Sequence, residues 1–427
     1  MKTQAVRIYG KGDLRLEQFE LPPIGDDEIL AHVVSDSICM SSYKAAMQGA
    51  DHKRVPDDVA DNPVVIGHEF CGEIVAVGKK WADKYKPGHK FAIQPAMNYK
   101  GSLAAPGYSY RYIGGDSTYA VVPNEVMETG CLLDYGGDAF FYGSLAEPVS
   151  CVIGAFHANY HTHAGSYVHH MGIAEGGNLA ILAGAGPMGL AAIDYAVHGP
   201  RKPGVCVVTD IDAQRLERAA AILPPEEAAR EGVKLIYVNT SGMDDPAGSL
   251  RRLCGDRGYD DLLVMAPVRP LVEQADAMLA RDGCLNFFAG PTDTAFTAGF
   301  NFYNVHYSST HVCGTSGGNI DDMREALALM EQGKINPAAM ITHVGGLNSV
   351  IETTLNLPHI PGGKKLVYTN KNLPMTAIAD FAELGKTDGF YAALARIVAD
   401  NNGLWCAAAE KYLLENAPEI SDVPEKR

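Results

Sequence analysis

A short glycine-rich run carries the first chemical signal in this chain. Residues 184–189 (GAGPMG) follow an apolar strand candidate over 178–183 and precede a helical stretch over 190–197. Strand, glycine turn and helix in this order are typical of dinucleotide binding. Such glycines permit a tight turn, let the backbone approach a pyrophosphate and let helix and strand pack closely, and the anion lies at the helix N-terminus. We therefore assign the following residues to cofactor binding: Gly184, Gly186, Pro187, Met188 and Gly189.

An acidic residue follows at the distance that this chemistry requires. A second strand candidate over 204–210 ends in Asp210, 21 residues after Gly189. A carboxylate there accepts hydrogen bonds from the adenosine ribose hydroxyls and repels a 2′-phosphate, which favours NAD(H) over NADP(H). Arg215 can flank the same ribose, although an ion pair on the helix surface explains it equally well. The alternative, a glycine turn in an unrelated α/β unit, explains less of the pattern.

Three residues before the glycine run are of types that bind zinc. Cys39, His68 and Glu147 can supply three ligands to Zn²⁺ and leave a fourth position open, as catalytic zinc requires. Glu69 lies directly beside His68. From residue type alone, a buried thiol, a hydrogen-bonded core histidine and a loop carboxylate explain the same positions. Both interpretations stay open at this point.

The elements that must position these residues form two regions with different secondary-structure patterns. Residues 1 to about 150 are β-rich, with short alternating runs such as 29–34 and 72–77 between Pro and Gly. Further on, strand and helix candidates alternate, which predicts a parallel sheet covered by helices. The strand candidates are 179–183, 205–209, 234–238, 261–265 and 284–288, and the helix candidates are 212–223, 271–280 and 321–332. Residues 371–427 predict two or three short amphipathic helices, for example over 403–415.

Composition excludes several classes of protein. The 427 residues indicate more than one domain, and the net charge of −16 argues against nucleic acid or an anionic membrane as the main partner. Nine cysteines without a C-x-x-C pair indicate reduced thiols and a cytoplasmic location. We expect no signal peptide and no membrane span, because the N-terminus lacks an apolar core and no apolar run approaches the required length.

The surroundings of the zinc candidates resemble a known family. Residues 62–78, which contain Gly67-His68-Glu69, closely resemble the zinc signature of the medium-chain dehydrogenases/reductases, and residues 312–322 resemble the family's return segment. Residues 146–150 (AEPVS) are similar to the sorbitol-dehydrogenase branch, where a Glu is the third protein ligand. The resemblance covers about residues 1–369. It implies a catalytic zinc on Cys39, His68 and Glu147, with Glu69 beside the metal.

The resemblance also implies an α/β fold with a Rossmann cofactor domain and a β-rich GroES-like catalytic domain. We expect the first part of the catalytic domain over 1–155, the Rossmann domain over 156–312, the return segment over 313–369 and a helical C-terminal extension over 370–427. The histidines His157, His161, His163, His169 and His170 lie in an apparent insertion, which predicts a polar surface loop or, less simply, a second metal site.

The chain departs from the family at two places. Residues 94–116, where many relatives have four cysteines, contain none, so we expect one catalytic zinc and no structural zinc. After the zinc cysteine, Ser41 falls on the hydroxyl that begins the family's proton relay. Ser42 replaces the acid that orients the zinc histidine, which puts that role in doubt. Lys44 stands where the relay often has a histidine; a lysine there can pass a proton, hold a phosphate or be a solvated surface charge.

Within the family, the pattern is most similar to enzymes that reduce L-sorbose 1-phosphate to glucitol 6-phosphate. We therefore expect a zinc-dependent oxidoreductase that interconverts a ketose phosphate and a polyol phosphate, working as a dimer or tetramer. The basic residues that can hold a phosphate are Lys44, Lys53, Arg54, Lys100 and Arg111. Two alternatives stay open: a dehydrogenase of a non-phosphorylated polyol or secondary alcohol, and a non-catalytic protein that senses NAD(H).

Overall fold

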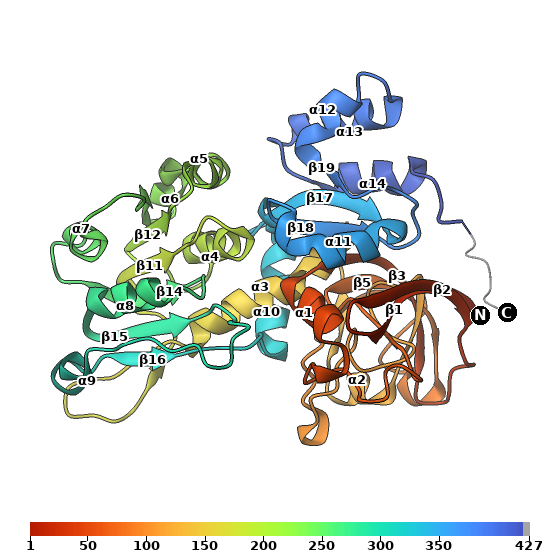
Figure 1. Ribbon diagram of the computed structural model, residues 1–427, viewed down its shortest axis with the longest axis horizontal. Coiled ribbons are helices and arrows are strands. Elements are labelled where there is room, and N and C mark those ends of the chain that lie inside the picture. Colours follow the sequence, from red (N-terminus) through yellow and green to blue (C-terminus); the bar gives the residue numbers. More distant parts are fainter. Residues whose placement is uncertain (422–427) are drawn as a thin grey trace. The chain divides into compact units, whose positions relative to one another are not determined.

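The computed structural model describes residues 1–421, and the chain divides into two compact units (Figure 1). The first unit contains Met1–Glu147 and the segment from Ile341 onward, and the second contains Pro148–Met340. The first boundary falls inside helix α3 (Phe140–Ala158). The return to the first unit was expected at residue 313, but the chain returns to it only at Ile341, so residues 313–340 belong to the second unit. Residues from 370 onward group with the first unit.

The first unit is built on two sheets. The larger, mostly antiparallel sheet has the order β19-β17-β18-β3-β5-β6-β8, with β7 beside β3, and the smaller has the order β2-β1-β4. The strands of the larger sheet are β3 (Ile29–Ile38), β5 (Phe70–Val77), β6 (Lys90–Ile93), β7 (Tyr119–Val122), β8 (Leu132–Tyr135), β17 (Ile341–Gly346), β18 (Lys364–Tyr368) and β19 (Thr376–Ala377). Those of the smaller sheet are β1 (Lys2–Gly10), β2 (Asp13–Glu20) and β4 (Val64–Val65).

Strand β3 leads directly to Cys39, and a strand from far along the chain lies beside it. β18 pairs antiparallel with β3, with Lys365 opposite Ile38. Helix α1 (Met40–Gln48) begins after Cys39 and buries Ser42, Ala45 and Ala46, the spacing of one helix face. Apolar residues of β3, α1 and β18 pack in one core cluster. The end of β3 is therefore held on both sides.

The second unit confirms the predicted parallel sheet. Six strands in the order β13-β12-β11-β14-β15-β16 pair in parallel throughout, the doubly wound arrangement of dinucleotide-binding folds. They are β11 (Asn178–Leu182), β12 (Val205–Asp210), β13 (Lys234–Asn239), β14 (Tyr259–Val264), β15 (Leu279–Phe287) and β16 (His311–Cys313). The predicted helices are present as α4 (Pro187–His198), α5 (Ala213–Ile222), α8 (Arg269–Met278) and α10 (Ile320–Glu331); α6 (Pro225–Arg230), α7 (Pro246–Arg252) and α9 (Phe302–Ser308) complete the unit.

Sequence patterns do not predict α3, which spans 19 residues with Pro148 inside it. Its apolar residues are buried on several faces, among them Leu145, Ala146 and Val149. A helix buried all round lacks the amphipathic period that identifies surface helices, and an internal proline ordinarily signals a break. Glu147 consequently lies on a helix rather than in a loop.

The C-terminal helices are α12 (Phe381–Leu384), α13 (Gly389–Asp400) and α14 (Ala407–Asn416). Glu410 of α14 is buried, and its carboxylate accepts hydrogen bonds from Phe140 N at 2.6 Å and Phe141 N at 2.9 Å. It also accepts from the Tyr368 hydroxyl at 2.9 Å. These donors lie at the first turn of α3, so Glu410 caps the helix that carries Glu147. Within residues 1–421, every helix is too short or too polar to cross a membrane.

Candidate metal and dinucleotide sites

Cys39, His68 and Glu69 come together in the first unit. Each offers one ligand atom, and these atoms lie within 4.8 Å of one another. In the part of the chain that the structure describes, this is the only group of three or more such residues at that spacing. Cys39 is the N-cap of α1, while His68 and Glu69 precede β5. Residues separated by about 30 positions in sequence thus form one buried cluster.

The His68 ring is fixed from both of its nitrogens. Ser42 Oγ lies 3.1 Å from Nδ1, and both Ser41 Oγ and the Tyr108 hydroxyl lie 3.1 Å from Nε2. Burial lowers the pKa of His68, which keeps the imidazole neutral, the form that binds a metal. Ser42 therefore supplies the orienting contact that the loss of the family's acid put in doubt. Sequence patterns gave no signal for Tyr108.

Glu69 is a buried carboxylate whose charge is already compensated. Lys364 Nζ lies 2.5 and 2.6 Å from its two carboxylate oxygens, and Ser37 Oγ donates to it as well. Burial opposes the charged form of Lys364, but Cys39 and Glu69 outweigh this and raise its pKa. Lys364 is not among the residues predicted from the sequence. It begins β18 (KKLVY) next to a second lysine, so the strand pattern does not mark it as a buried cation.

Glu147 belongs to the same electrostatic environment but not to the three-residue group. It is buried on α3, and burial together with repulsion from Glu69 raises its pKa to about 7. Interactions with His68 and Cys39 also act on its carboxyl group. Burial likewise raises the pKa of the Cys39 thiol. A sulfur, an imidazole nitrogen and a carboxylate oxygen within 4.8 Å of one another, at Cys39, His68 and Glu69, form a donor set that fits Zn²⁺.

The glycine run lies between β11 and α4 in the second unit. Gly186 is the N-cap of α4 and Pro187 its first residue, so free N–H groups face outward at this end. A Cβ on Gly189 would lie 2.0 Å from the carbonyl oxygen of Gly184, whereas a Cβ on Gly186 would meet nothing within 4 Å. Gly189 thus serves helix packing, and Gly186 leaves space in front of the backbone.

The two residues expected at the adenosine ribose differ in their surroundings. Asp210 ends β12, is buried, and accepts from Ala185 N at 3.2 Å and Ile211 N at 2.8 Å. Its contact with Ala185 ties the acid to the glycine run. Arg215 forms an ion pair with Asp212 at 3.5 Å, and both side chains are about half exposed. The helix-surface ion pair that sequence left open for Arg215 is therefore present.

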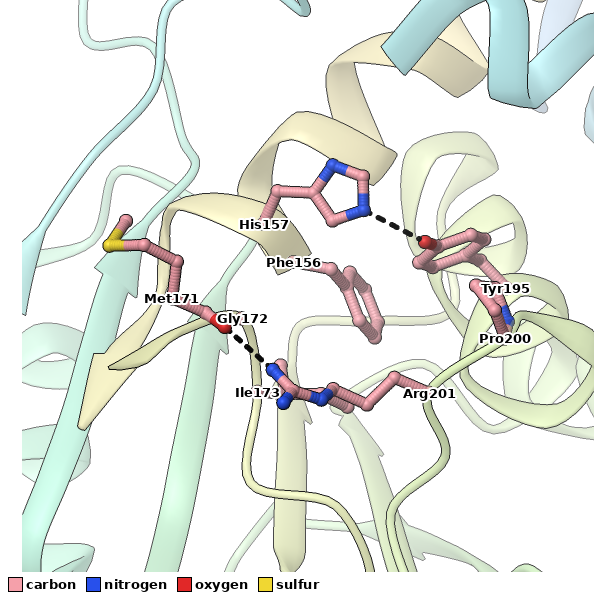
Figure 2. Close-up of a pocket in the computed structure, with 8 residues that line it drawn as sticks. All are labelled: Phe156, His157, Met171, Gly172, Ile173, Tyr195, Pro200 and Arg201. Atoms are coloured by element: carbon pink, nitrogen blue, oxygen red, sulfur yellow. Dashed lines mark hydrogen bonds between the residues drawn. The ribbon is translucent and has the colours of Figure 1, made fainter. Parts of the chain in front are cut away.

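The histidine-rich insertion forms a small hairpin of β9 (Tyr160–His161) and β10 (His170–Met171), with a pocket next to it (Figure 2). The pocket is lined in part by His157, Tyr195 and Arg201. Tyr195 belongs to α4, and Arg201 follows its C-terminal end. Since 12 helical residues span about 18 Å, this pocket lies at the end of α4 opposite the glycine run. It is not the dinucleotide site.

The second unit has the doubly wound sheet of dinucleotide-binding folds, and the first unit holds the cluster of Cys39, His68 and Glu69. Together these features are typical of a metal-dependent, nucleotide-linked dehydrogenase. Family models agree: residues 25–130 match the alcohol dehydrogenase GroES-like domain and residues 187–332 match zinc-binding dehydrogenase. The chain belongs to the zinc-binding alcohol dehydrogenase family and is an oxidoreductase of that family.

Three known proteins illustrate the similarity. The chain is 53% identical to mannitol-1-phosphate 5-dehydrogenase of Aliivibrio fischeri, over 97% of this chain and 98% of the relative. It is 52% identical to L-sorbose 1-phosphate reductase of Klebsiella pneumoniae, over 98% and 99%. The solved 2R,3R-butanediol dehydrogenase of Bacillus subtilis superposes with a TM-score of 0.68 at 22% identity, over 86% of this chain and all of that one, which shows the shared fold.

Proposed function

We propose that this protein is a zinc-dependent, NAD(H)-linked oxidoreductase that interconverts a ketose phosphate and a polyol phosphate. The favoured reaction is reduction of L-sorbose 1-phosphate to glucitol 6-phosphate. The observation that carries the proposal is the cluster of Cys39, His68 and Glu69, with the buried Glu147 interacting electrostatically with all three. It lies within a chain that is similar over 97–98% of its length to two sugar-phosphate oxidoreductases.

Cys39, His68 and Glu147 would hold the zinc. When bound, zinc supplies a Lewis acid for a carbonyl or hydroxyl oxygen, and the nicotinamide supplies or accepts a hydride. Ser41 lies at hydrogen-bond distance from both His68 Nε2 and Cys39 Sγ, so its hydroxyl is placed to take a proton from the substrate hydroxyl and to return it in the reverse direction. Glu69, paired with Lys364, keeps the pocket's charge balanced beside the metal.

The decisive experiment compares phosphorylated and free substrates in the zinc-loaded enzyme. L-Sorbose 1-phosphate and L-sorbose are tested with NADH; mannitol 1-phosphate, glucitol 6-phosphate and free glucitol are tested with NAD⁺. We expect kcat/KM to be far higher for L-sorbose 1-phosphate than for L-sorbose, and far higher for at least one of the two polyol phosphates than for free glucitol. A phosphorylated-to-free ratio near one would reject phosphate recognition and favour a dehydrogenase of free polyols. If the purified chain takes up no zinc and turns over none of these substrates, the non-catalytic NAD(H) sensor is favoured.

The cofactor preference rests on Asp210. We expect NADH to be used faster than NADPH, because the buried carboxylate would repel a 2′-phosphate. Asp210→Ser should narrow or reverse this preference, measured as the ratio of kcat/KM for the two cofactors. If the unmodified enzyme uses NADPH much faster, Asp210 does not bind the ribose. We further propose a cytoplasmic homo-oligomer, a dimer or tetramer, which sedimentation analysis of the purified chain would test.

A further inference from the structure

We propose that the Arg54 guanidinium binds the phosphate group of the substrate, with the adjacent Lys53 strengthening the positive potential around it. The inference rests on the proposed function, since it names the residue that would distinguish a sugar phosphate from a free sugar. Arg54 is thus a specificity-determining residue of the same site.

Tyr108 connects Arg54 to the metal cluster. The guanidinium carbon of Arg54 lies over the Tyr108 ring, 5.8 Å from its centre. The same ring lies 4.7 Å from the His68 ring, and the Tyr108 hydroxyl is 3.1 Å from His68 Nε2. The distance from the guanidinium carbon of Arg54 to the centre of the His68 ring therefore cannot exceed the sum of these two distances to the Tyr108 ring centre. That is the scale of a hexose phosphate held with one oxygen at the metal.

The backbone and side chain of Arg54 are held in place. Ser109 Oγ donates to the Arg54 carbonyl at 2.6 Å, and Arg54 Nη1 donates to the Leu103 carbonyl at 3.0 Å. The remaining N–H groups of the guanidinium form a planar fork, which suits two phosphate oxygens at once. An arginine fixed in this way loses little conformational freedom when a phosphate binds.

His52 adds a neutral donor next to the guanidinium. Its ring stacks on Tyr108 with the centres 5.6 Å apart, and its Nδ1 accepts from Arg54 N at 3.3 Å. Burial, followed by the charges of Lys53 and Arg54, lowers the pKa of His52 to about 4. His52 is therefore neutral at pH 7 with its proton on Nε2. Lys44 also lowers the pKa of His52.

No acid in the described residues forms an ion pair with Arg54. Asp51 in the same loop forms an ion pair with Lys11, and Asp58 accepts from Asn62 at 2.7 Å. Over residues 1–421, no carboxylate forms an ion pair with Arg54 or Lys53. In a chain with a net charge of −16, a guanidinium without an ion-pair partner near the metal cluster favours an anionic ligand.

The other two basic candidates have different surroundings. Lys100 is exposed and lies over the Tyr99 ring at 4.7 Å. Arg111 donates to Asn62 Oδ1 at 2.9 Å and lies over the Tyr112 ring at 5.6 Å. Their contacts thus lie away from Tyr108 and His68, which makes Arg111 a matched control for Arg54.

The test uses the zinc-loaded, full-length enzyme and three variants: Arg54→Met, Arg54→Lys and Arg111→Met. For Arg54→Met we expect kcat/KM for the phosphorylated substrate to fall roughly ten- to a hundredfold more than kcat/KM for the free sugar, the worth of a charge-assisted contact. Arg54→Lys should lie between this variant and the parent, and Arg111→Met should match the parent. Inorganic phosphate should inhibit the parent competitively and Arg54→Met more weakly.

The outcomes separate the two proposals. If the parent does not distinguish phosphorylated from free substrate, the proposed function fails and this inference with it. If the parent does distinguish them but Arg54→Met loses equally on both substrates, or no more than Arg111→Met, the phosphate is bound elsewhere and only the inference fails. If Arg54→Met turns over the sugar phosphate too slowly to measure, inhibition by inorganic phosphate is measured with the free sugar as substrate. Equal inhibition of the parent and Arg54→Met would then reject the inference.

Discussion

The metal cluster consists of side-chain groups, whereas the glycine run presents mainly backbone groups. At the cluster, the proposed ligands are side chains: a half-buried thiol lies with a buried imidazole and buried carboxylates, and Lys364 supplies a counter-charge. At the glycine run, the proposed contact with the cofactor is made by the backbone, and a Cβ on Gly186 would enter open space. The first site depends on residues from four segments, including β18 and α3, whereas the second lies within one strand–turn–helix unit.

This difference predicts how each site should respond to mutation. Burying charged groups costs several kcal/mol per ion unless every partner is present, so loss of one member of the cluster should affect the others. A backbone site has few such dependencies, and binding and stability can be separated by choosing the glycine. The following predictions test that contrast in order of expected effect.

Loss of a zinc ligand should have the largest effect. Cys39→Ser and Glu147→Ala should each abolish turnover while leaving the fold largely intact, because an open catalytic site contributes less to folding than a closed one. Elemental analysis should find one zinc per chain in the parent and less in both variants, with circular dichroism as the fold control. Two tightly held zincs in the parent would contradict the expected absence of a structural zinc.

Removal of the buried counter-charge should reduce stability strongly. Lys364→Met leaves the Glu69 carboxylate buried without its ion-pair partner, which ordinarily costs about 3–5 kcal/mol. Denaturant unfolding of the variant measures this. The double variant Lys364→Met with Glu69→Gln should recover part of the loss. No recovery would show that the two side chains do not act as a pair.

Glu410 should make stability depend on pH. Burial raises its pKa to about 7, above the ordinary value near 4.5, so the folded protein favours the protonated form. The stability that this raised pKa contributes is fully present below about pH 4.5 and is lost as the pH rises to 7. The free energy of unfolding falls by at most about 3 kcal/mol over this range. Relative to Glu410→Gln, the parent should lose stability between pH 5 and pH 8 in denaturant unfolding. An unchanged difference between the two at both pH values would contradict this.

The two glycines should separate stability from binding. Gly189→Ala places a methyl group against the Gly184 carbonyl and should cost about 1–3 kcal/mol of stability, as overpacking does. Gly186→Ala should leave the melting temperature nearly unchanged but weaken NADH binding, because its methyl group enters the space in front of the backbone. Thermal melts and fluorescence titration with NADH measure the two effects. Equal melting temperatures for both variants would remove the distinction.

The local structure around the glycine run was more predictable from the sequence than the contacts of the metal cluster, for a physical reason. Gly184, Gly189 and Asp210 lie within one local unit, so their spacing alone carries the information. Ser42 shows the limit of family patterns, since a hydroxyl makes the contact that an acid was expected to make. Lys364 is almost 300 residues from Glu69, and a single sequence carries no signal for so distant a pairing. α3 was missed because it is buried on several faces.

The cap on α3 has a consequence for the order of events during synthesis. Residues up to Glu147 leave the ribosome long before Lys364 and Glu410, which supply the counter-charge at Glu69 and the acceptor for the first N–H groups of α3. Strand β3 can pair with β18 only after residues 364–368 have been synthesised. The nascent first unit therefore stays incomplete until nearly the whole chain has been made, while the parallel sheet of the second unit can assemble earlier. Zinc should be captured late, by an almost finished protein.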